Sequence, residues 1–460
     1  MALMSSISGF RGLVGEDINA LSVLNYTEAF VNSLTVENKR ICIGRDTRKS
    51  GIFIKDAVIS TIIALGYEAV DIGIAPTPTT LHATRKLNSD GGIIITASHN
   101  PPMWNALKLS NPDGLFLDEK SINLIVERSK NILREINWAT YDAIGNIQEK
   151  YDYYKNYIDD ILTNFNIEAI RKMGFKIAYD PVGGAATIAD RYFFERLGCK
   201  TIPVNAEITG DFPRNPEPTP QNLKLLSEVV KNSHANLGFA QDPDADRLSV
   251  VTGNGVPVSE EFTIVLAGEG FLRKKKTDIA CNLSTSLLIE DLARKFSVSV
   301  HRTKIGEAFV TEKILKEGLE YGGEGNGGVI IPSINPCRDS FVGMAQILEL
   351  LAETGKTIEE IVNTYPAYKM IKDKIDLKGK VNDKDHFYDK ILRKIKYDLP
   401  NFEINTIDGV KIIGDKQWLH LRLSNTEPQI RIVAESLSEK HSRSLIDIGK
   451  KVLSDIIDLR

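Results

Sequence analysis

The chain has 460 residues, of which 42% are hydrophobic and 26% are charged, and its formal net charge is −4. This length exceeds what one hydrophobic core usually supports and predicts about three or four domains of ordinary globular composition. The small negative charge argues against general binding of nucleic acid or acidic membranes. No apolar run reaches the length of a membrane span and the N-terminus lacks a secretory pattern, so we expect a cytoplasmic protein without membrane partners.

The first notable segment is Ser8-Gly-Phe-Arg-Gly12. An arginine between glycines can bring its guanidinium close to a phosphate without obstruction by neighbouring side chains. A surface turn explains the same residues, and the residues alone favour the turn over a phosphate contact by Arg11. Strands and helices then alternate from about residue 41, which predicts a mostly parallel sheet with crossover helices.

Small and polar residues directly follow a short buried strand in Gly91-Gly-Ile-Ile-Ile-Thr-Ala-Ser-His-Asn-Pro-Pro102. The two prolines prevent further ladder pairing, so we expect Ser98 on a tight loop at the carboxyl end of a strand, where open α/β sheets bind ligands. A serine beside His99, and ten residues before Lys108, is suited to act as a nucleophile or phosphate carrier. A plain polar turn is about equally compatible with these residue types.

A second α/β unit begins near Phe175 and leads to Gln241-Asp-Pro-Asp-Ala-Asp-Arg247. On a helix, Asp242, Asp244 and Asp246 would point to different sides, but in a loop they can converge on one point. Carboxylates held that close repel one another unless a cation neutralises them, and oxygen ligands suit Mg²⁺. A solvated acidic turn is the alternative.

A third α/β unit contains Arg302-Thr-Lys-Ile-Gly306, a candidate phosphate loop with Lys304 exposed. It also contains Tyr321-Gly-Gly-Glu-Gly-Asn-Gly-Gly328, where five glycines surround Glu324 and Asn326. We expect a flexible segment of little packing value, through which a carboxylate and an amide reach the hydroxyls of a ligand. A flexible surface loop without function explains the glycines equally well.

Lysines and aspartates are frequent over residues 370–396, which predicts a linker followed by a small, separately packed domain. Within it, an alternating strand at 418–423 carries Arg422 opposite its leucines, and the next strand carries Arg431. The loop Ser424-Asn-Thr-Glu-Pro428 between them offers hydroxyls, an amide and backbone N–H groups, which suit a phosphate dianion. An ordinary hairpin with surface arginines is the alternative.

These loops resemble motifs of the α-D-phosphohexomutases. Thr96-Ala-Ser-His-Asn-Pro101 resembles the active-site serine loop, the Asp-x-Asp-x-Asp-Arg segment resembles the Mg²⁺ loop, and Arg422-x-Ser-x-Thr-Glu-Pro-x-x-Arg431 resembles the phosphate-binding loop. The Gly-φ-Arg-Gly segment also has a counterpart that reaches the active site. The chain departs from the common Gly-Glu-x-Ser-Gly-His sugar loop, because Asn326 replaces serine and Gly328 stands where many members have histidine. This departure leaves the general acid or base unassigned.

The resemblance spans essentially the whole chain. It implies three similar α/β domains with mixed, mostly parallel sheets, plus a C-terminal α+β domain, around a central cleft. We place these domains at residues 1–147, 148–251, 252–366 and 367–460. They would carry the serine, metal, sugar and phosphate loops in that order, in a monomer or a homodimer.

The implied reaction interconverts hexose 6-phosphate and hexose 1-phosphate through phosphoserine and a hexose 1,6-bisphosphate, which is both intermediate and activator, with Mg²⁺ as cofactor. The residues of the implied site fall into four groups: Ser98, His99, Lys108, Arg11 and Arg247 for catalysis; Asp242, Asp244, Asp246 and Ser98 for the metal; Glu324, Asn326, Lys304 and Gly306 for the sugar; and Arg422, Ser424, Asn425, Thr426 and Arg431 for the phosphate.

The short N-terminal motif and the glycine-rich sugar loop resemble those of phosphoglucosamine mutases more than the histidine-bearing pattern, and this resemblance favours glucosamine phosphate as substrate over glucose or mannose phosphate. Three other classes compete with a mutase. A metal-dependent phosphatase using Ser98 needs an open, wet site, and an acyl-phosphate phosphatase using an aspartate would leave Ser98 without a role. A sugar-phosphate sensor would bind without turnover. The completeness of the motifs argues against the sensor.

Overall fold

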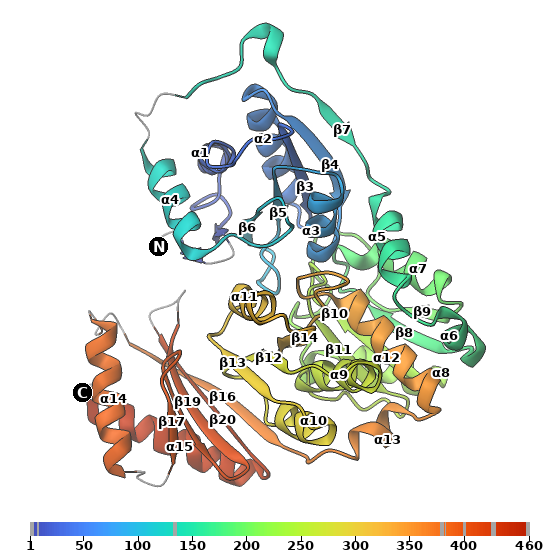
Figure 1. Cartoon of the computed structure of the whole chain (residues 1–460), viewed down its shortest axis with the longest axis vertical. Coiled ribbons are helices and arrows are strands. Elements are labelled where there is room, and N and C mark those ends of the chain that lie inside the picture. Colours follow the sequence, from blue (N-terminus) through green and yellow to red (C-terminus); the bar gives the residue numbers. More distant parts are fainter. Residues whose placement is uncertain are drawn as a thin grey trace.

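The computed structural model describes residues 4–6, 9–131, 136–377, 381, 383–398, 402–424 and 429–456. They form four domains, each built on one sheet (Figure 1). Domain I, blue to teal, lies at the top of Figure 1, and domain IV, orange to red, lies at the lower left. The expected fold, three α/β domains followed by an α+β domain, is confirmed.

Domain I has a seven-stranded sheet in the order β1-β2-β6-β5-β3-β4-β7. Strand β3 pairs in parallel with β5 on one side and with β4 on the other. Strand β6 pairs antiparallel with β5, and β2 pairs antiparallel with β6. The elements are β1 (Met4–Ser6), β2 (Gly9–Leu13), β3 (Arg40–Arg45), β4 (Glu68–Ile74), β5 (Gly91–Ile95), β6 (Trp104–Ser110), β7 (Ile147–Glu149), α1 (Ala20–Val31), α2 (Gly51–Ala64), α3 (Thr77–Lys86) and α4 (Glu119–Lys130). Branched residues of β3 and β5 are fully buried against Phe30 of α1, which fixes the strand ends that carry the site.

Arg11, expected on a turn, lies in strand β2 and pairs with Ala106 of β6. Gly9 makes this pairing possible, because a Cβ there would lie 2.0 Å from the carbonyl oxygen of Leu107. Its φ of 120° is also unfavourable for residues with a side chain. The strand therefore holds Arg11 more rigidly than a turn would.

Domains II and III each pair three parallel strands with one antiparallel edge strand, in the orders β11-β10-β8-β9 and β13-β12-β14-β15. The elements of domain II are α5 (Tyr153–Leu162), α6 (Ile167–Met173), β8 (Lys176–Asp180), α7 (Ala186–Arg196), β9 (Lys200–Pro203), α8 (Lys224–Ser233), β10 (Leu237–Gln241) and β11 (Leu248–Thr252). Those of domain III are α9 (Glu261–Lys274), β12 (Ile279–Asn282), α10 (Leu288–Phe296), β13 (Val300–Thr303), α11 (Glu307–Glu317), β14 (Tyr321–Glu324), β15 (Gly328–Ile330), α12 (Ser340–Thr354) and α13 (Ile358–Val362). One continuous apolar core joins the two domains, with Phe193 of α7 packed edge-on against Phe341 of α12.

The glycine-rich segment of domain III is a buried β-hairpin, so the expectation of a flexible loop with little packing value is wrong. Strands β14 and β15 pair antiparallel, with Gly322 opposite Ile330. A Cβ on Gly323 would lie 2.1 Å from the carbonyl oxygen of Gly328, and one on Gly325 would lie 1.8 Å from a carboxylate oxygen of Glu261. The glycines allow close packing here, which the residue types alone do not distinguish from flexibility.

Domain IV has the antiparallel sheet β16-β20-β19-β18-β17. Its elements are β16 (Lys369–Asp376), α14 (Lys384–Asp398), β17 (Glu403–Asn405), β18 (Val410–Gly414), β19 (Gln417–Leu423), β20 (Gln429–Ser436) and α15 (Glu439–Ile456). The charged segment expected as a linker begins with β16, because Ile371 and Ile375 share one face and pack on the core while most of the other positions carry charged residues. Among the helices of the described residues, none has the length and apolarity needed to span a membrane.

Domain IV docks on domain III through buried polar contacts. His420 of β19 donates from Nε2 to the carbonyl oxygen of Asp408 at 2.6 Å, so its Nδ1 accepts from the Ser284 hydroxyl at 2.9 Å. Lys411 of β18 donates to the carbonyl oxygen of Leu283 at 2.6 Å. Burial lowers the pKa of His420 to about 4, and the nearby Lys411 charge opposes protonation further.

We expect acid to weaken the fold through His420. Between pH 6.5 and about 4 the unfolded chain binds a proton that the folded chain does not, so stability falls as the pH decreases through this window. The loss attributable to this group is roughly 3 kcal/mol. Urea unfolding at pH 7 and pH 4.5 should therefore show a smaller loss for His420→Gln than for the wild type. His386→Gln, at an exposed position of the same domain, should match the wild type; equal losses in all three proteins would contradict the assignment.

Candidate active site

Ser98 lies on a loop that starts where β5 ends, at the carboxyl edge of the domain I sheet. It is 3% exposed and has φ of 50°, an uncommon conformation for a residue other than glycine. The Ser98 N–H donates to Thr96 Oγ1 at 3.0 Å, and Thr96 Oγ1 donates to Asp46 at 2.7 Å. The loop is thus tied to the end of the neighbouring strand β3.

Arg48 is the main support of the serine loop. Its guanidinium is completely buried, pairs with Asp46 at 2.9 Å, and donates to the carbonyl oxygens of Ser98, Asn100 and Pro101 at 2.6 to 2.8 Å. Since backbone carbonyls in an irregular loop have no ladder partners, one planar donor group satisfies three of them.

Replacing Arg48 with methionine should destabilise the protein by about 3–5 kcal/mol, because it leaves buried Asp46 and three carbonyl oxygens without their cation. Urea denaturation at pH 7 measures this change. A loss below about 1 kcal/mol would mean that other contacts hold the loop.

The three aspartates lie on the loop that joins antiparallel strands β10 and β11. They are at most 1% exposed, and one carboxylate oxygen of each lies within 4.8 Å of the others. Ser98 Oγ donates to Asp242 at 2.8 Å. Lys108 of β6 donates to Asp244 at 2.7 Å. The structure therefore brings the serine loop of domain I against the acidic loop of domain II.

Each aspartate is restrained by a different segment. The Thr77 hydroxyl at the start of α3 donates to Asp244 at 2.6 Å, and Arg338 of domain III pairs with Asp246. Burial and repulsion by the other two aspartates raise the pKa of Asp242 well above its ordinary value. Burial also acts on Asp244, but Lys108 outweighs it and leaves the pKa of Asp244 below its ordinary value.

The acidic loop fits a hard divalent cation. The Oδ1 atoms of Asp244 and Asp246 are buried and lack a hydrogen-bond partner among the described residues, while the Oδ2 atoms are held by protein donors. Unpartnered buried oxygens that converge on one point are costly without a cation. The donors are all oxygens, as Mg²⁺ prefers.

A histidine and several basic residues lie near the serine. His99 Nδ1 lies 3.5 Å from Ser98 Oγ, and the charge of Arg247, together with burial, lowers the pKa of His99 well below its ordinary value. Arg11 donates to the side-chain oxygen of Asn100 at 2.7 Å. Lys108 stays charged, because Asp244 outweighs the effect of burial and raises its pKa.

Glu324 stands at the end of β14 and is 3% exposed. Its carboxylate accepts from the Gly306 N–H at 3.1 Å, from Asn282 at 2.8 Å and from Arg338 at 2.7 Å. Lys304, expected beside the sugar, instead lies over the Phe309 ring and lines a neighbouring cavity. Gly306 therefore supports Glu324 through its backbone.

In domain IV, Arg422 pairs with Asp408 at 2.8 Å, and the Ser424 N–H donates to the carbonyl oxygen of Gln429 at 2.8 Å. Asn425 and Thr426 lie outside the described residues.

A cleft of about 800 Å³ lies beside these groups and is lined by His99, Arg247, Asn326 and Arg422 among others. All four domains contribute to its lining, including Arg11, His99, Asn100, Glu217, Arg247, Asn282, Asn326, Lys372, Arg422 and Arg431. A second cavity of about 740 Å³ lies beside it and shares Arg422, together with Lys304 and residues of α4 and α14. A ligand in the cleft would meet Arg247, next to the three aspartates, and also the arginines of domain IV, Arg422 and Arg431.

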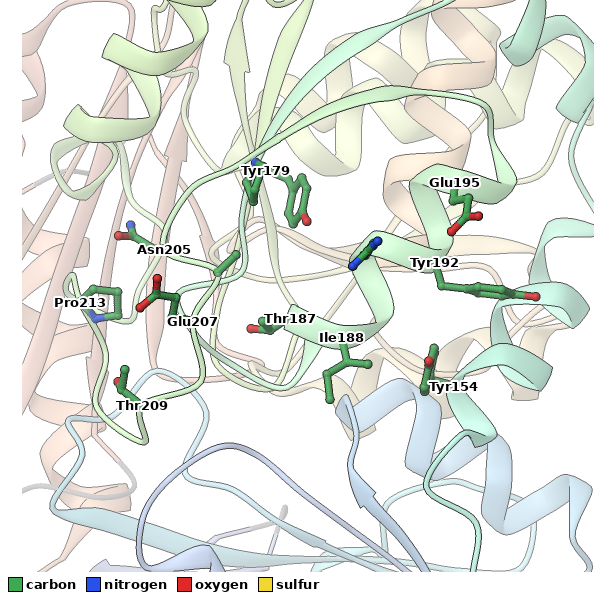
Figure 2. Close-up of a pocket in the computed structure, with 13 residues that line it drawn as sticks. Tyr154, Tyr179, Thr187, Ile188, Tyr192, Glu195, Asn205, Glu207, Thr209 and Pro213 are labelled. Carbon is green, nitrogen blue, oxygen red and sulfur yellow. The ribbon is translucent and has the colours of Figure 1, made fainter.

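A larger cavity, about 1020 Å³, lies on domain II (Figure 2). Tyr154 and Tyr192 stand at one end, with ring centroids 6.0 Å apart, and Asn205 and Glu207 at the other. None of the residues that line it belongs to the predicted site, so cavity size alone does not locate the chemistry.

Sequence reasoning missed Asp46, Thr77, Arg48 and Arg338. The first three follow strands whose carboxyl ends meet at the edge that carries Ser98, so this rule could have found them. Arg338 has no such signal, because its side chain reaches the site from the segment between β15 and α12.

Comparison with known proteins places this geometry in a family. Residues 5–135, 155–255 and 259–368 match the phosphoglucomutase/phosphomannomutase alpha/beta/alpha domains I, II and III. A phosphoglucomutase/phosphomannomutase from Thermococcus kodakarensis is 36% identical over 98% of both chains. A phosphoglucosamine/phosphogalactosamine mutase from Sulfurisphaera tokodaii is 32% identical, covering 98% of this chain and 99% of that protein.

A solved structure shares the fold over nearly the whole chain. It is the N-acetylphosphoglucosamine mutase of Aspergillus fumigatus in complex with GlcNAc-6P and magnesium, with a TM-score of 0.63 at 14% identity, covering 99% of this chain and 96% of that one. The motifs, the four-domain cleft and the full-length relatives agree. The chain belongs to the phosphoglucomutase/phosphomannomutase family and is a phosphohexomutase.

Proposed function

We propose that this enzyme interconverts glucosamine 6-phosphate and glucosamine 1-phosphate, with Ser98 as the residue that carries the phosphoryl group. The observation that supports this most is the contact of 2.8 Å between Ser98 Oγ and Asp242, inside an acidic cluster beside a cleft that four domains share. A sugar phosphate has two ends, and this cleft offers a charged group for each.

In the first step, the phosphorus–oxygen bond to Ser98 breaks as a new bond forms to the free hydroxyl oxygen of the sugar phosphate. The product is a hexose 1,6-bisphosphate, and the proton of that hydroxyl must leave while Ser98 Oγ regains one. His99, neutral and 3.5 Å from Ser98 Oγ, and Lys108 are the groups that we assign to proton transfer and to neutralising the transferred group. Arg247 and Arg11 border the same space.

The second step is the reverse transfer from the other end of the sugar. The bisphosphate must turn within the cleft, so both ends need a site that accepts either phosphate. We assign Arg422, Ser424, Asn425, Thr426 and Arg431 to the phosphate that does not react, and Glu324 and Asn326 to the sugar hydroxyls. Positioning and charge neutralisation supply most of the catalysis of phosphoryl transfer, which suits this division.

We assign Mg²⁺ to Asp242, Asp244 and Asp246, where it would supply positive charge against the phosphoryl oxygens. The related fungal mutase was solved with magnesium, which supports this assignment. Hexose 1,6-bisphosphate would be the activator that phosphorylates Ser98. We further propose a cytoplasmic monomer or homodimer.

The choice of glucosamine rests on the sugar loop, where Asn326 and Gly328 depart from the histidine form, and on the name of the Sulfurisphaera relative. The Thermococcus relative carries the glucose and mannose names, so a phosphoglucomutase/phosphomannomutase activity is the second candidate.

Competition among substrates tests the proposal. Turnover is measured by phosphorus NMR with Mg²⁺ and the bisphosphate that matches each substrate. We expect kcat/KM to be higher for glucosamine 1-phosphate than for glucose 1-phosphate or mannose 1-phosphate. A higher kcat/KM for glucose or mannose 1-phosphate would reassign the substrate. Release of inorganic phosphate at the rate of turnover would instead indicate a phosphatase.

A further inference from the structure

One buried arginine, outside every predicted motif, joins two parts of the site. Arg338 is 7% exposed, and its guanidinium donates to Glu324 at 2.7 Å and to Asn326 at 3.3 Å. The same guanidinium pairs with Asp246 of the acidic loop and donates from Nε to Glu307 at 3.1 Å. A single side chain thus contacts the metal loop of domain II and the sugar loop of domain III.

Gly328 provides the space for this arginine. A Cβ on Gly328 would lie 2.2 Å from Cδ and 2.8 Å from Cγ of Arg338. Gly328 does not have a left-handed backbone conformation, so space and not φ is the reason for glycine here. Any side chain at 328, including histidine, would displace the aliphatic part of the Arg338 side chain from its present position.

Arg338 lies among three carboxylates whose negative charges would otherwise repel one another. Burial would lower the pKa of Arg338, but Asp246, Glu307 and Glu324 outweigh it and leave that pKa well above its ordinary value. The planar fork of a guanidinium can hold three carboxylates in fixed directions, whereas the ammonium of lysine is a single point charge. The geometry therefore needs arginine specifically.

We propose that Arg338 is a positioning residue that holds Asp246 and Glu324 in one fixed arrangement, with Gly328 as the glycine that this arrangement requires. The metal end and the sugar end of the site are then assembled together, and neither loop can shift alone. This inference deepens the proposed function and rests on it for the roles of Asp246 and Glu324.

The first test compares Arg338→Met with Arg338→Lys. Mg²⁺ affinity is measured by calorimetry without substrate, alongside kcat, KM and Tm. We expect Arg338→Met to weaken Mg²⁺ binding about tenfold or more, to lower kcat by a similar factor and to raise KM, because partners of metal ligands have effects of this size. Arg338→Lys should recover Tm but not Mg²⁺ affinity or kcat.

Arg128→Met is the matched control, because it removes the ion pair of 2.9 Å between Arg128 and the buried Glu28 of domain I, away from the cleft. It should lower Tm only. The positioning role would be overturned if Arg338→Lys recovered every property, because charge neutralisation alone would then suffice. It would also be overturned if Arg338→Met bound Mg²⁺ as tightly as the wild type or more tightly. If the wild type converts no hexose phosphate, the proposed function fails, while the Mg²⁺ affinities still decide the role of Arg338.

The second test asks whether Gly328 and Arg338 depend on each other. This test adds a third variant at 338, Arg338→Ala. We expect Gly328→Ala to lose Mg²⁺ affinity and kcat to the same extent as Arg338→Ala. The double variant should be no worse than Arg338→Ala, because the added Cβ then lies 3.4 Å from the remaining Cβ at 338, an ordinary contact. Wild-type Mg²⁺ affinity and kcat in Gly328→Ala, or additive losses in the double variant, would show that the two residues are not coupled.

Discussion

Replacing Ser98 with alanine is expected to lower kcat for hexose phosphate interconversion by on the order of 10⁴-fold or more, since the covalent route loses its carrier. The fold should survive. Alanine keeps the Cβ that already tolerates φ of 50°, and the Ser98 N–H keeps its acceptor, Thr96 Oγ1. The variant loses the hydrogen bond to Asp242, which costs about 0.5–1.5 kcal/mol or less.

Steady-state assays with Mg²⁺ and the 1,6-bisphosphate measure this change, and intact mass with a peptide map shows whether Ser98 carries one phosphate. Ser110→Ala is the matched control: Ser110 is a buried serine of β6 in the same sheet, and its hydroxyl has no hydrogen-bond partner among the described residues. Activity that survives in Ser98→Ala, together with an unmodified serine in the wild type, would move the phosphoryl group to an aspartate of the acidic loop.

The sequence was informative where a chemical group and its loop are contiguous. The serine loop directly follows a strand, so the rule that ligands meet the carboxyl ends of strands predicted its position. The acidic and phosphate loops were predicted from the residue types that they bring together. Periodicity likewise predicted β19, because leucines occupy every second position over residues 418–423. These are local patterns.

What the sequence could not reveal depends on distant packing. The glycines at 322–328 are required by atoms of other segments, such as Glu261 beside Gly325, and no local pattern records that contact. Lys304 follows a strand just as the site residues do, yet the side chain turns to Phe309. Arg338 acts through contacts with Asp246 of domain II and Glu324 of domain III, which exist only once these domains are assembled.

Removing the metal is expected to lower kcat by about 10³-fold, since a divalent cation at the reacting phosphate supplies several kcal/mol. Treatment with EDTA, followed by titration of Mg²⁺, measures the loss and its recovery. Activity that persists after complete removal of divalent cations would mean that Lys108, Arg247 and Arg11 suffice to neutralise the transferred group.

Asp244→Asn assigns that requirement to the acidic loop. It removes one negative charge while preserving size, and we expect Mg²⁺ affinity to fall by about 10- to 100-fold. Asp190→Asn is the matched control, because Asp190 is a completely buried aspartate of the same domain whose pKa burial raises well above its ordinary value. Asparagine there preserves the size of a side chain that is not one of the three clustered aspartates, so Mg²⁺ binding should be retained. Calorimetry on the two variants separates a loss of ligand charge from a general loss of folding. Equal weakening of Mg²⁺ binding in both variants would contradict the metal site. Weakening confined to Asp244→Asn would place the cation between Ser98 and domain II.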